Sequence, residues 1–405
     1  MRPLINRLLS LARNRFLQRI FVFLFIKPLF KIFVWIFYLP CCLLPLSNER
    51  ILFFNGTDGA FSCNPRYLFE KIYETFGDKY EYIWILKRPE TVPVHYGKAI
   101  KVAKYMSPRF FYYLATSKIW VVNTHFLSEV RPRKSQVYLQ TWHAAGAFKK
   151  FGIQTRAYDK SVIKMIAKDA SHFTYLLCSA PICRKVYASA FGISIDKVKA
   201  TGIPRNDILF NVSNTSKQKI KRKLEEEYGV DPTKKIILYA PTFRDFQMFS
   251  CFTPDIGYMK SKLGDKYVLL MRLHPVIPLA NFRDMVDSAF TFDVKKYVDV
   301  QELLMVTDLL ITDYSSIIFD YAILGRPMIF FPWDLDKYKK ERAFYFDYED
   351  FVPGPICFST EELVEKILSV DKWFDRDKML EFARKFNHPF DGRASERVIK
   401  LLGLK

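Results

Sequence analysis

The chain has 405 residues, half of them hydrophobic, and a formal net charge of +20 at pH 7. This length exceeds one ordinary hydrophobic core and predicts two domains of about 150 to 200 residues with additional segments. The composition excludes large-scale disorder. The charge predicts an anionic partner, and nucleic acid, an anionic membrane surface or a polyphosphate substrate would each qualify. The seven cysteines show no Cys-x-x-Cys or paired Cys-His spacing, which indicates a reducing compartment and argues against structural zinc.

Residues 1–48 differ in kind from the rest of the chain. The first 31 residues contain seven Arg or Lys and no acidic residue, and residues 20–46 are almost wholly apolar or aromatic. This stretch offers no small-residue cleavage site, so we do not expect a signal peptide. Lys27, Pro28 and Lys31 interrupt the apolar run that a spanning helix needs. We therefore expect a membrane-associating segment that lies in the plane of the cytoplasmic leaflet, with one spanning helix as the alternative.

From Arg50 onward, strand-like and helix-like segments alternate, which is typical of parallel sheets with helices on both faces. A stretch rich in Lys and Glu separates two such halves. We predict an N-terminal Rossmann-like domain over residues 49–212, a linker over 213–233, and a C-terminal Rossmann-like domain with final helices over 234–405. Two such halves would enclose a cleft, with a donor in one half and an acceptor in the other. The strands expected in the first half are residues 51–54, 80–86, 118–122, 137–141 and 174–178.

The most informative stretch runs from Val306 to Phe331. An apolar run ends in Thr312-Asp313-Tyr314-Ser315-Ser316, a helical pattern continues through Asp320 to Gly325, and a second apolar run follows. This order predicts a strand, a polar turn, a helix and a strand. Serines at the start of a helix cap its backbone N–H groups, and the same N–H groups can hold a phosphate. For an isolated Ser-Ser pair, capping alone is the simpler explanation.

Two more loops favour a binding site over capping. The strand-like runs 235–240 and 267–271 both end in polar residues, and parallel strands of one open sheet bring such loops to its carboxyl edge, where ligands bind. We therefore expect three loops to converge on one anionic ligand. The polar residues that these two loops supply are Thr242, Arg244, Asp245, Arg272 and His274.

Two of the six histidines follow predicted strands, namely His143 and His274. An imidazole titrates near neutral pH and can take a proton from an attacking hydroxyl or stabilise a leaving group. From the sequence alone, a structural role is an equal alternative for each of them, and His125 is a weaker third candidate. Neither a P-loop nor a Gly-x-Gly-x-x-Gly turn is present, and no nucleic-acid-binding module is recognisable. Phosphoryl transfer suits this set of residues, since it needs positioning and charge stabilisation above all.

Ordered motifs give the chain a specific resemblance. From about Ile51 to the C-terminus it resembles the CDP-glycerol glycerophosphotransferase family, bacterial enzymes that prime or polymerise teichoic acids and related capsule polymers. The motifs that carry the resemblance are Asn64-Pro65-Arg66, Trp142-His143 with Lys149-Lys150-Phe151-Gly152, Gly202-Ile203-Pro204-Arg205-Asn206-Asp207, Ala240 to Asp245, Arg272-Leu273-His274-Pro275, Leu310 to Ser316, Pro353-Gly354-Pro355 and Asp391-Gly392-Arg393-Ala394-Ser395.

The resemblance implies a fold and a division of labour. It implies the GT-B architecture, with no dedicated catalytic metal and no cofactor. It makes His143 the base for the acceptor hydroxyl and His274 the group that stabilises the departing CMP. The donor side implied in this way comprises Thr242, Arg244, Arg272, His274, Ser315 and Ser316. The remaining substrate-binding residues implied by the motifs are Asp245, Thr312, Asp313, Asp320, Gly202, Pro204 and Arg205.

One departure from the family pattern concerns the loop after His143. Ala144-Ala145-Gly146 replaces the Gly that usually follows this histidine in long polymerases, and the chain carries no large additional N-terminal domain, so it looks more like the priming branch. We expect a transferase, peripheral on the cytoplasmic face of the membrane, that moves glycerol phosphate or ribitol phosphate from its CDP ester to a lipid-linked glycan or polymer and releases CMP. The alternatives are a GT-B nucleotide-sugar glycosyltransferase and a non-catalytic membrane protein that binds polyanions.

Overall fold

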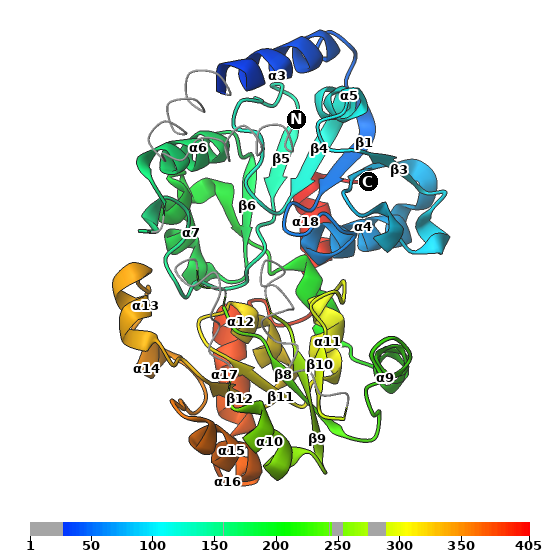
Figure 1. The fold of residues 1–405 in the computed structure, drawn as a ribbon. Helices are drawn as coiled ribbons and strands as arrows, with labels where there is room; N and C mark the ends of the chain where they lie inside the picture. Colours follow the sequence, from blue (N-terminus) through cyan, green and yellow to red (C-terminus); the bar gives the residue numbers. More distant parts are fainter. Residues whose placement is uncertain (1–26, 157, 243, 245–253, 274–288) are drawn as a thin grey trace, which may run out of the picture.

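The computed structural model describes residues 27–156, 158–242, 244, 254–273 and 289–405. Two predicted site residues, His274 and Asp245, lie outside the described residues, as does most of the basic N-terminal segment. The two halves of the chain form two α/β domains, which Figure 1 shows one above the other.

The first domain is built on a seven-stranded sheet in which each pair of neighbouring strands is parallel. The strand order is β3-β2-β1-β4-β5-β6-β7, so the order reverses between β1 and β4. The sequence predicted five of these strands and missed β3 and β7, which have four and three residues. The bounds are β1 Ser47–Phe54, β2 Glu81–Ile85, β3 Ile100–Ala103, β4 Ser117–Val122, β5 Val137–Gln140, β6 Tyr175–Cys178 and β7 Val198–Ala200.

The second domain repeats the plan with five parallel strands in the order β10-β9-β8-β11-β12. Its order reverses between β8 and β11, which pair directly. In doubly wound folds a ligand crevice forms at this kind of reversal, outside the carboxyl ends of the strands. The bounds are β8 Lys235–Tyr239, β9 Tyr267–Met271, β10 Thr291–Asp293, β11 Leu309–Thr312 and β12 Met328–Phe330.

Helices cover both faces of each sheet (Figure 1). Their bounds are α3 Lys27–Cys41, α4 Cys63–Phe76, α5 Pro108–Thr116, α6 Lys160–Ser171, α7 Arg184–Phe191, α8 Asp207–Phe210, α9 Asn214–Tyr228, α10 Ile256–Leu263, α11 Val300–Val306, α12 Ile317–Tyr321, α13 Leu335–Glu341, α14 Tyr348–Phe351, α15 Thr360–Leu368, α16 Val370–Trp373, α17 Arg376–Phe386 and α18 Ala394–Leu402. Their buried aliphatic and aromatic side chains pack on strand side chains that are themselves buried, and this removal of apolar surface from water is the main stabilising term of the fold.

The last helix, α18, returns to the first domain. Its Val398 and Ile399 belong to the same apolar core as Leu68 of α4, and the Tyr80 hydroxyl donates to the backbone oxygen of Lys405 at 3.0 Å. The sequence-based division placed all final helices with the second half. In the structure α18 instead packs on the first sheet, because its apolar stripe completes the core there.

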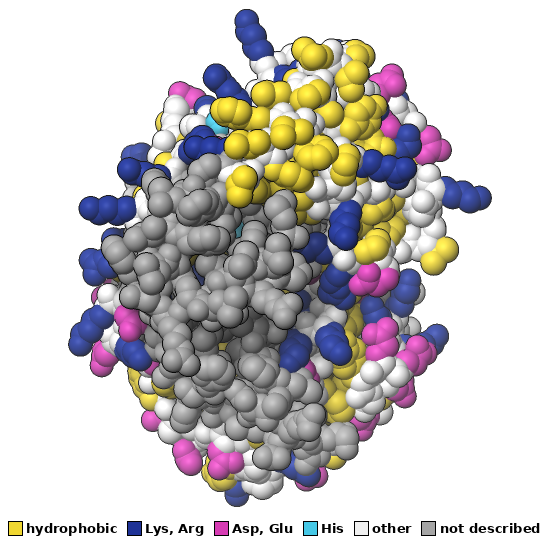
Figure 2. Space-filling view, turned by 45° about the horizontal axis from the view of Figure 1, so that its top comes forward, with side chains coloured by type: hydrophobic (Ala, Val, Ile, Leu, Met, Phe, Trp, Pro, Cys, Tyr) yellow, Lys and Arg dark blue, Asp and Glu magenta, His cyan; other side chains and the backbone are white. Residues whose placement is uncertain are grey.

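Helix α3 is apolar on two sides. One side packs on the first domain through buried Val34 and Tyr38 and through Phe37, whose ring stacks on Phe111 of α5. The other side stays exposed, and Figure 2 shows the resulting apolar patch on the top of the molecule. Within the described part of the chain no helix has the length and apolar character that crossing a membrane requires. The exposed apolar residues of this helix and of the chain just after it are Leu29, Ile32, Trp35, Ile36, Leu39, Leu43 and Leu44.

Candidate active site

A cavity of about 280 Å³ lies where the two domains meet. From the first domain it is lined by His143, which lies three residues after the end of β5 at Gln140, and by Arg205, which follows β7. The second domain contributes the segments after β8, β9 and β11. These are three loops that the sequence predicted to converge, and each of them does reach this cavity. Their lining residues are Ala240, Pro241, Arg272, Leu273, Ser315 and Ser316.

The ring of His143 has a defined orientation and protonation. Its Nδ1 lies 2.9 Å from the backbone oxygen of Asn123. A carbonyl oxygen only accepts hydrogen bonds, so Nδ1 carries the proton in the neutral ring and Nε2 keeps its lone pair. Burial lowers the pKa of His143 to about 4, with the positive charge of Arg205 adding to the effect. The imidazole is therefore neutral at pH 7, with an unprotonated nitrogen available to take a proton.

Buried side-chain amides hold the backbone around His143, and one of them, Asn64, also binds the turn with Arg205. Trp142 has a positive φ of 53°, a conformation that non-glycine residues rarely adopt and that the surroundings must stabilise. Asn64 of α4 supplies that stabilisation, since its Nδ2 donates to the backbone oxygen of Trp142 at 2.8 Å. Its Oδ1 accepts from the backbone N–H of Arg205 at 3.1 Å. One side chain thus fixes both elements that the first domain brings to the cavity.

Arg205 joins the two domains. Its Nη2 lies 2.6 Å from Oδ2 of Asp320 in α12, and its Nη1 donates to the backbone oxygen of His143 at 2.7 Å. Both side chains of the ion pair are buried. Burial by itself would lower the pKa of Arg205. Asp320 and Cys63 outweigh that effect and raise this pKa above its ordinary value. The ion pair therefore fixes the position of α12 relative to His143.

Arg272 presents a positive charge to the cavity. Its Nη1 donates to the backbone oxygens of Tyr297, at 2.8 Å, and Val294, at 3.3 Å. No carboxylate among the described residues forms an ion pair with it, and burial lowers its pKa from the ordinary value. Asp299 and Asp58 offset part of the effect of burial without contacting the guanidinium, and an enclosed charge that is only partly compensated is costly. An anionic ligand in this cavity would supply the missing charge.

The two serines lie at the start of α12, but they cap it weakly. Ser316 makes no side-chain cap hydrogen bond, and Ser315 Oγ accepts from the Ile317 N–H at a long 3.4 Å. Capping therefore does not account for these hydroxyls, and both serines line the cavity. The predicted helix to Gly325 is split into the five-residue α12 and one 3₁₀ turn, which Gly325 ends with a positive φ of 57°.

The neighbouring polar residues of this turn serve the loop itself. Thr312 Oγ1 donates to the Ala240 backbone oxygen at 2.7 Å, and Asp313 Oδ1 accepts from the Thr242 N–H at 2.8 Å. Thr242 Oγ1 is buried and has no hydrogen-bond partner among the described residues. These bonds tie the loop after β8 to the loop after β11, so the two approach the cavity as one unit. A donor-binding role for these three residues stays a prediction.

Arg244 is engaged in a buried ion network. Its Nη1 lies 2.8 Å from Oδ2 of Asp313, and its Nε lies 2.8 Å from Oδ2 of Asp334. One guanidinium faces two carboxylates here. Asp313 also raises the pKa of nearby Lys149, although burial, the larger effect, lowers that pKa to about 8. In this arrangement Arg244 organises the loop. It is not among the residues that line the cavity, and its predicted contact with substrate stays a prediction.

Gly202 and Pro204 shape the turn before Arg205. Gly202 has a φ of +78°, and a side chain there would meet Cβ of Ala394 at 3.0 Å, so this position requires glycine. Pro204 begins the 3₁₀ turn that carries Arg205. Neither residue lines the cavity, and their predicted contact with substrate remains an expectation. His125, the weaker candidate, lies with its Nδ1 3.4 Å from Asp169 and its ring 5.2 Å from that of Trp142.

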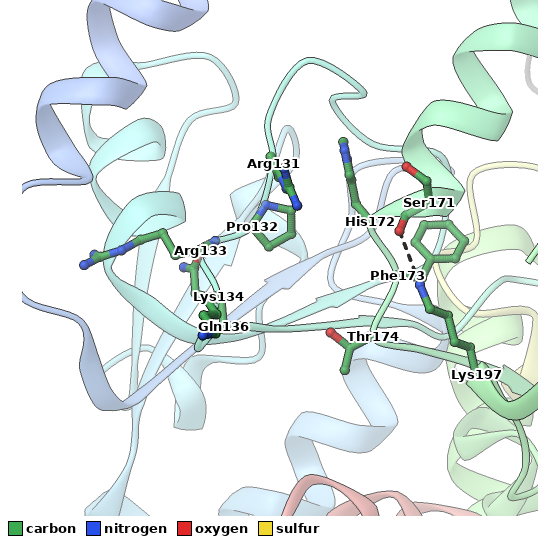
Figure 3. A pocket seen from close by; sticks show the side chains of 10 residues that line it. All are labelled: Arg131, Pro132, Arg133, Lys134, Gln136, Ser171, His172, Phe173, Thr174 and Lys197. Carbon is green, nitrogen blue, oxygen red and sulfur yellow. Dashed lines mark hydrogen bonds between the residues drawn. The ribbon is translucent and has the colours of Figure 1, made fainter. Parts of the chain in front are cut away.

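A second pocket lies at the opposite end of the strands of the first sheet. It has a volume of about 400 Å³, and its lining segments precede β5, β6 and β7, at the amino ends of these strands. Figure 3 shows Arg131 on one side of it and Ser171, His172 and Lys197 on the other. The cavity with His143 and this basic pocket therefore lie at opposite ends of the strands of one sheet.

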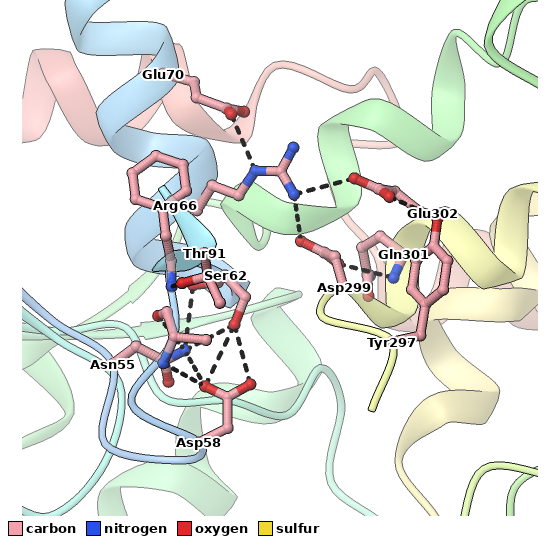
Figure 4. Close-up of polar contacts among 12 residues, drawn as sticks. Asn55, Asp58, Ser62, Arg66, Glu70, Thr91, Tyr297, Asp299, Gln301 and Glu302 are labelled. Carbon is pink, nitrogen blue, oxygen red and sulfur yellow. Dashed lines mark hydrogen bonds and ion pairs between the residues drawn. The ribbon is translucent and has the colours of Figure 1, made fainter. Parts of the chain in front are cut away.

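A further contact between the domains surrounds Arg66. Figure 4 shows its guanidinium between Glu70 on its own helix and two carboxylates of the second domain. Its Nη1 lies 3.1 Å from both Asp299 and Glu302, and its Nε lies 2.9 Å from Glu70. Burial alone would lower the pKa of Arg66, yet the surrounding negative charge raises it above the ordinary value. This network and the Arg205–Asp320 pair hold the domains together beside the cavity.

Sequence reasoning missed the partners that position these groups. Asn123, Asp299 and Asp334 are far in sequence from the residues they bind, and no local spacing marks them. Asn64 stands in one of the motifs of the resemblance, but the sequence did not show which backbone groups it binds. In the described part of the chain, no group of three His, Cys, Asp or Glu side chains is arranged to hold a metal ion.

Two parallel sheets with their carboxyl edges at a shared cavity define an α/β protein of the GT-B class. Over residues 36–403 the chain matches the family described as CDP-Glycerol:Poly(glycerophosphate) glycerophosphotransferase. It belongs to that family, which confirms the resemblance predicted from the motifs.

Individual relatives agree with this assignment. The chain is 34% identical to the teichoic acid poly(ribitol-phosphate) polymerase of Bacillus spizizenii over 88% of its own length but only 56% of that relative's. It is 31% identical to the teichoic acid poly(glycerol phosphate) polymerase of the same organism, covering 89% of this chain and 94% of the relative. Among solved structures, the wall teichoic acid polymerase TagF matches with a TM-score of 0.81 at 28% identity, covering 92% of this chain and 93% of that one.

Proposed function

We propose that the protein transfers glycerol phosphate or ribitol phosphate from its CDP ester to a hydroxyl of a lipid-linked glycan or polymer and releases CMP. One observation carries the proposal: the neutral, oriented imidazole of His143 and the unpaired cation of Arg272 line the same cavity. A base and an anion-binding group at opposite walls are what transfer of an alditol phosphate to a hydroxyl requires.

The transfer step uses the groups already described. Nε2 of His143 takes the proton from the acceptor hydroxyl, whose oxygen attacks the phosphorus that bears the alditol. The bond between that phosphorus and the bridging oxygen of the pyrophosphate breaks, and CMP leaves with the electron pair. Arg272 stabilises the charge that develops on the departing phosphate, and the hydroxyls of Ser315 and Ser316 add hydrogen bonds. The imidazolium of His143 then loses its proton to solvent.

The low pKa of His143 matters for this step. A free imidazole has a pKa of about 6.5, so part of it would be protonated and inactive at neutral pH. In the protein the neutral form dominates, although a base with a pKa of about 4 is weaker. When the negatively charged donor enters beside Arg205 and Arg272, its charge raises the pKa of His143 toward neutrality and so strengthens the base.

The donor side belongs to the second domain and the acceptor side to the first. The loops with Arg272 and Ser315 follow strands of the second sheet, whereas His143 and Arg205 follow strands of the first. Glycerol and ribitol donors both fit this assignment, because the relatives include a poly(glycerol phosphate) polymerase and a poly(ribitol-phosphate) polymerase.

The exposed apolar face of α3 supports peripheral association with the cytoplasmic face of a membrane. Trp35 and Ile36 are 56% and 60% exposed on a helix whose opposite side is packed on the first domain. A contiguous exposed apolar patch is unusual for a protein surface that meets only water. Lying in a bilayer interface would bury this face and bring the active site to a lipid-borne acceptor.

A panel of nucleotide donors tests the proposal. The purified protein, with bacterial membranes as the acceptor source, is incubated with CDP-glycerol, CDP-ribitol, UDP-sugars or GDP-sugars, and the released nucleotide is measured. We expect CMP from a CDP-alditol, with the alditol phosphate recovered in the lipid-linked fraction. Release of UDP or GDP from a sugar donor would identify a glycosyltransferase instead. Absence of turnover with every donor would support a polyanion-binding protein.

A further inference from the structure

The basic pocket at the amino ends of β5, β6 and β7 has no part in the proposed transfer. It lies beside Arg131, Arg133 and Lys134 in the segment before β5, Ser171 and His172 before β6, and Lys197 before β7. The cavity with His143 is at the other edge of this sheet, beyond the full length of the strands. The pocket is therefore a separate feature that needs its own explanation.

Its positive charges are not neutralised by the protein. Among the described residues, no carboxylate forms an ion pair with any of the four Lys or Arg side chains that line it. Lys197 Nζ donates only to the Ser171 backbone oxygen, at 3.3 Å. The Nδ1 atom of His172 is buried and has no hydrogen-bond partner in the described structure. Burial lowers the pKa of His172, and the charges of Arg131 and Lys197 contribute to the shift.

The loop that lines the pocket contacts α3 and the residues just after it. The Tyr38 hydroxyl of α3 donates to the backbone oxygen of Arg131 at 2.9 Å. Nη1 of Arg133 donates to the backbone oxygen of Leu44, just after this helix, also at 2.9 Å. A surface that buries α3 in a bilayer interface therefore brings lipid head groups next to the loop with Arg131 and Arg133.

We propose that this pocket binds the phosphate of an anionic glycerophospholipid, with the acyl chains directed to the apolar face of α3. The unpaired guanidinium and ammonium groups match a phosphodiester, and a volume of about 400 Å³ accommodates a head group. The inference rests on the membrane association proposed above and gives it lipid specificity. It is independent of the transfer step, because none of these side chains reaches the catalytic cavity.

Vesicle binding of the full chain tests the inference. Binding is measured to vesicles of phosphatidylcholine alone and of phosphatidylcholine with phosphatidylglycerol, at fixed ionic strength. The pocket variant is Arg131→Gln with Lys197→Gln. The matched control is Lys219→Gln with Arg222→Gln, which removes the same charge from exposed positions on α9 in the second domain. CMP release with a soluble acceptor analogue should be equal in both variants and the wild type.

We expect the wild type and the control to prefer phosphatidylglycerol vesicles and the pocket variant to lose about tenfold or more of that preference, since each basic residue near an anionic surface contributes to binding. Equal preference in the pocket and control variants would overturn the inference while leaving membrane association intact. Displacement of the wild type from phosphatidylglycerol vesicles by millimolar inorganic phosphate, at constant ionic strength, would identify a free-phosphate site and also overturn it. Failure of the wild type to bind any vesicle would contradict both the inference and the proposed membrane association.

Discussion

Nη2 of Arg205 lies 2.6 Å from Oδ2 of Asp320, and this buried ion pair crosses from the first domain to the second at the wall of the cavity that His143 lines. The same guanidinium donates to the backbone oxygen of His143. The position of the proposed base is thus coupled to the helix that follows Ser315 and Ser316. Substitutions at this pair should affect stability and activity together.

The variant Asp320→Asn should lower both the free energy of unfolding and the rate of CMP release. It leaves the charge of Arg205 buried without its partner, and breaking a buried pair in this way costs about 3–5 kcal/mol. Denaturant unfolding measures the loss of stability, and CMP release measures the loss of activity. Glu361→Gln, which removes a carboxylate from an exposed position of α15, serves as the control and should change neither. An Asp320→Asn variant as stable as the control would contradict the role assigned to this pair.

The pH dependence of kcat/KM should report the low pKa of His143. A general base works in its deprotonated form, so the rate falls as the pH falls through the pKa of the free enzyme. With that pKa at about 4, kcat/KM should stay flat between about pH 5.5 and 7, where an ordinary imidazole would lose most of its activity. Circular dichroism at each pH checks that the protein is folded. An acidic limb with a midpoint near 6.5 would contradict the assigned protonation.

The double variant Ser315→Ala with Ser316→Ala should raise the apparent KM for the donor about tenfold or more and lower kcat. Hydrogen bonds to a charged group contribute about 1.5–3 kcal/mol each, and neither hydroxyl is committed to capping in the structure. Arg272→Met should raise the apparent KM for the donor more than the apparent KM for the acceptor. Unchanged steady-state constants in the double variant would return these serines to a structural role.

The exposed face of α3 should control membrane binding. Deletion of residues 1–46 would be a poor test, because Val34 and Tyr38 belong to the core of the first domain. The triple variant with Trp35, Ile36 and Leu39 each replaced by Gln keeps that core and should shift the protein from the membrane to the supernatant. Its activity on a soluble acceptor analogue should persist. Salt should extract the wild type in part, since it screens the basic segment but not the apolar face.

A matched control is available for this variant. Val94, Phe358 and Leu368 are also exposed apolar residues, but they lie away from α3. Replacing these three by Gln removes a similar apolar area and should leave the distribution between membrane and supernatant unchanged. Equal release of both triple variants would argue against α3 as the membrane-binding element. Resistance of the wild type to salt and to alkaline carbonate would favour a spanning segment.

Much of this arrangement could be predicted from the sequence. Strands β8, β9 and β11 are apolar runs that end in polar residues, and that pattern was sufficient to bring Pro241, Arg272 and Ser315 to one cavity. Short strands such as β10 carry too few residues for their period to be recognised. The site also depends on long-range contacts that no local pattern contains. Asn64 and Asn123 orient His143 from distant elements, and Asp334 pairs with Arg244 across 90 residues.

The role of Arg244 shows the same limit in physical terms. Its loop position predicted contact with substrate, since an arginine at a strand end is well placed to bind phosphate. The sequence could not show that two buried carboxylates already face this guanidinium. His274, the second histidine predicted to act in transfer, lies outside the described residues, and its role stays a prediction.

The most direct test of the account is CMP release from a CDP-alditol by His143→Ala, compared with the wild type on the same lipid-linked acceptor. The account predicts that the variant folds normally, binds the donor through the second domain, and releases CMP at least about 100-fold more slowly, because loss of a general base costs about 10²–10⁴-fold. A folded His143→Ala variant that releases CMP at the wild-type rate would contradict the assignment of His143 as the base.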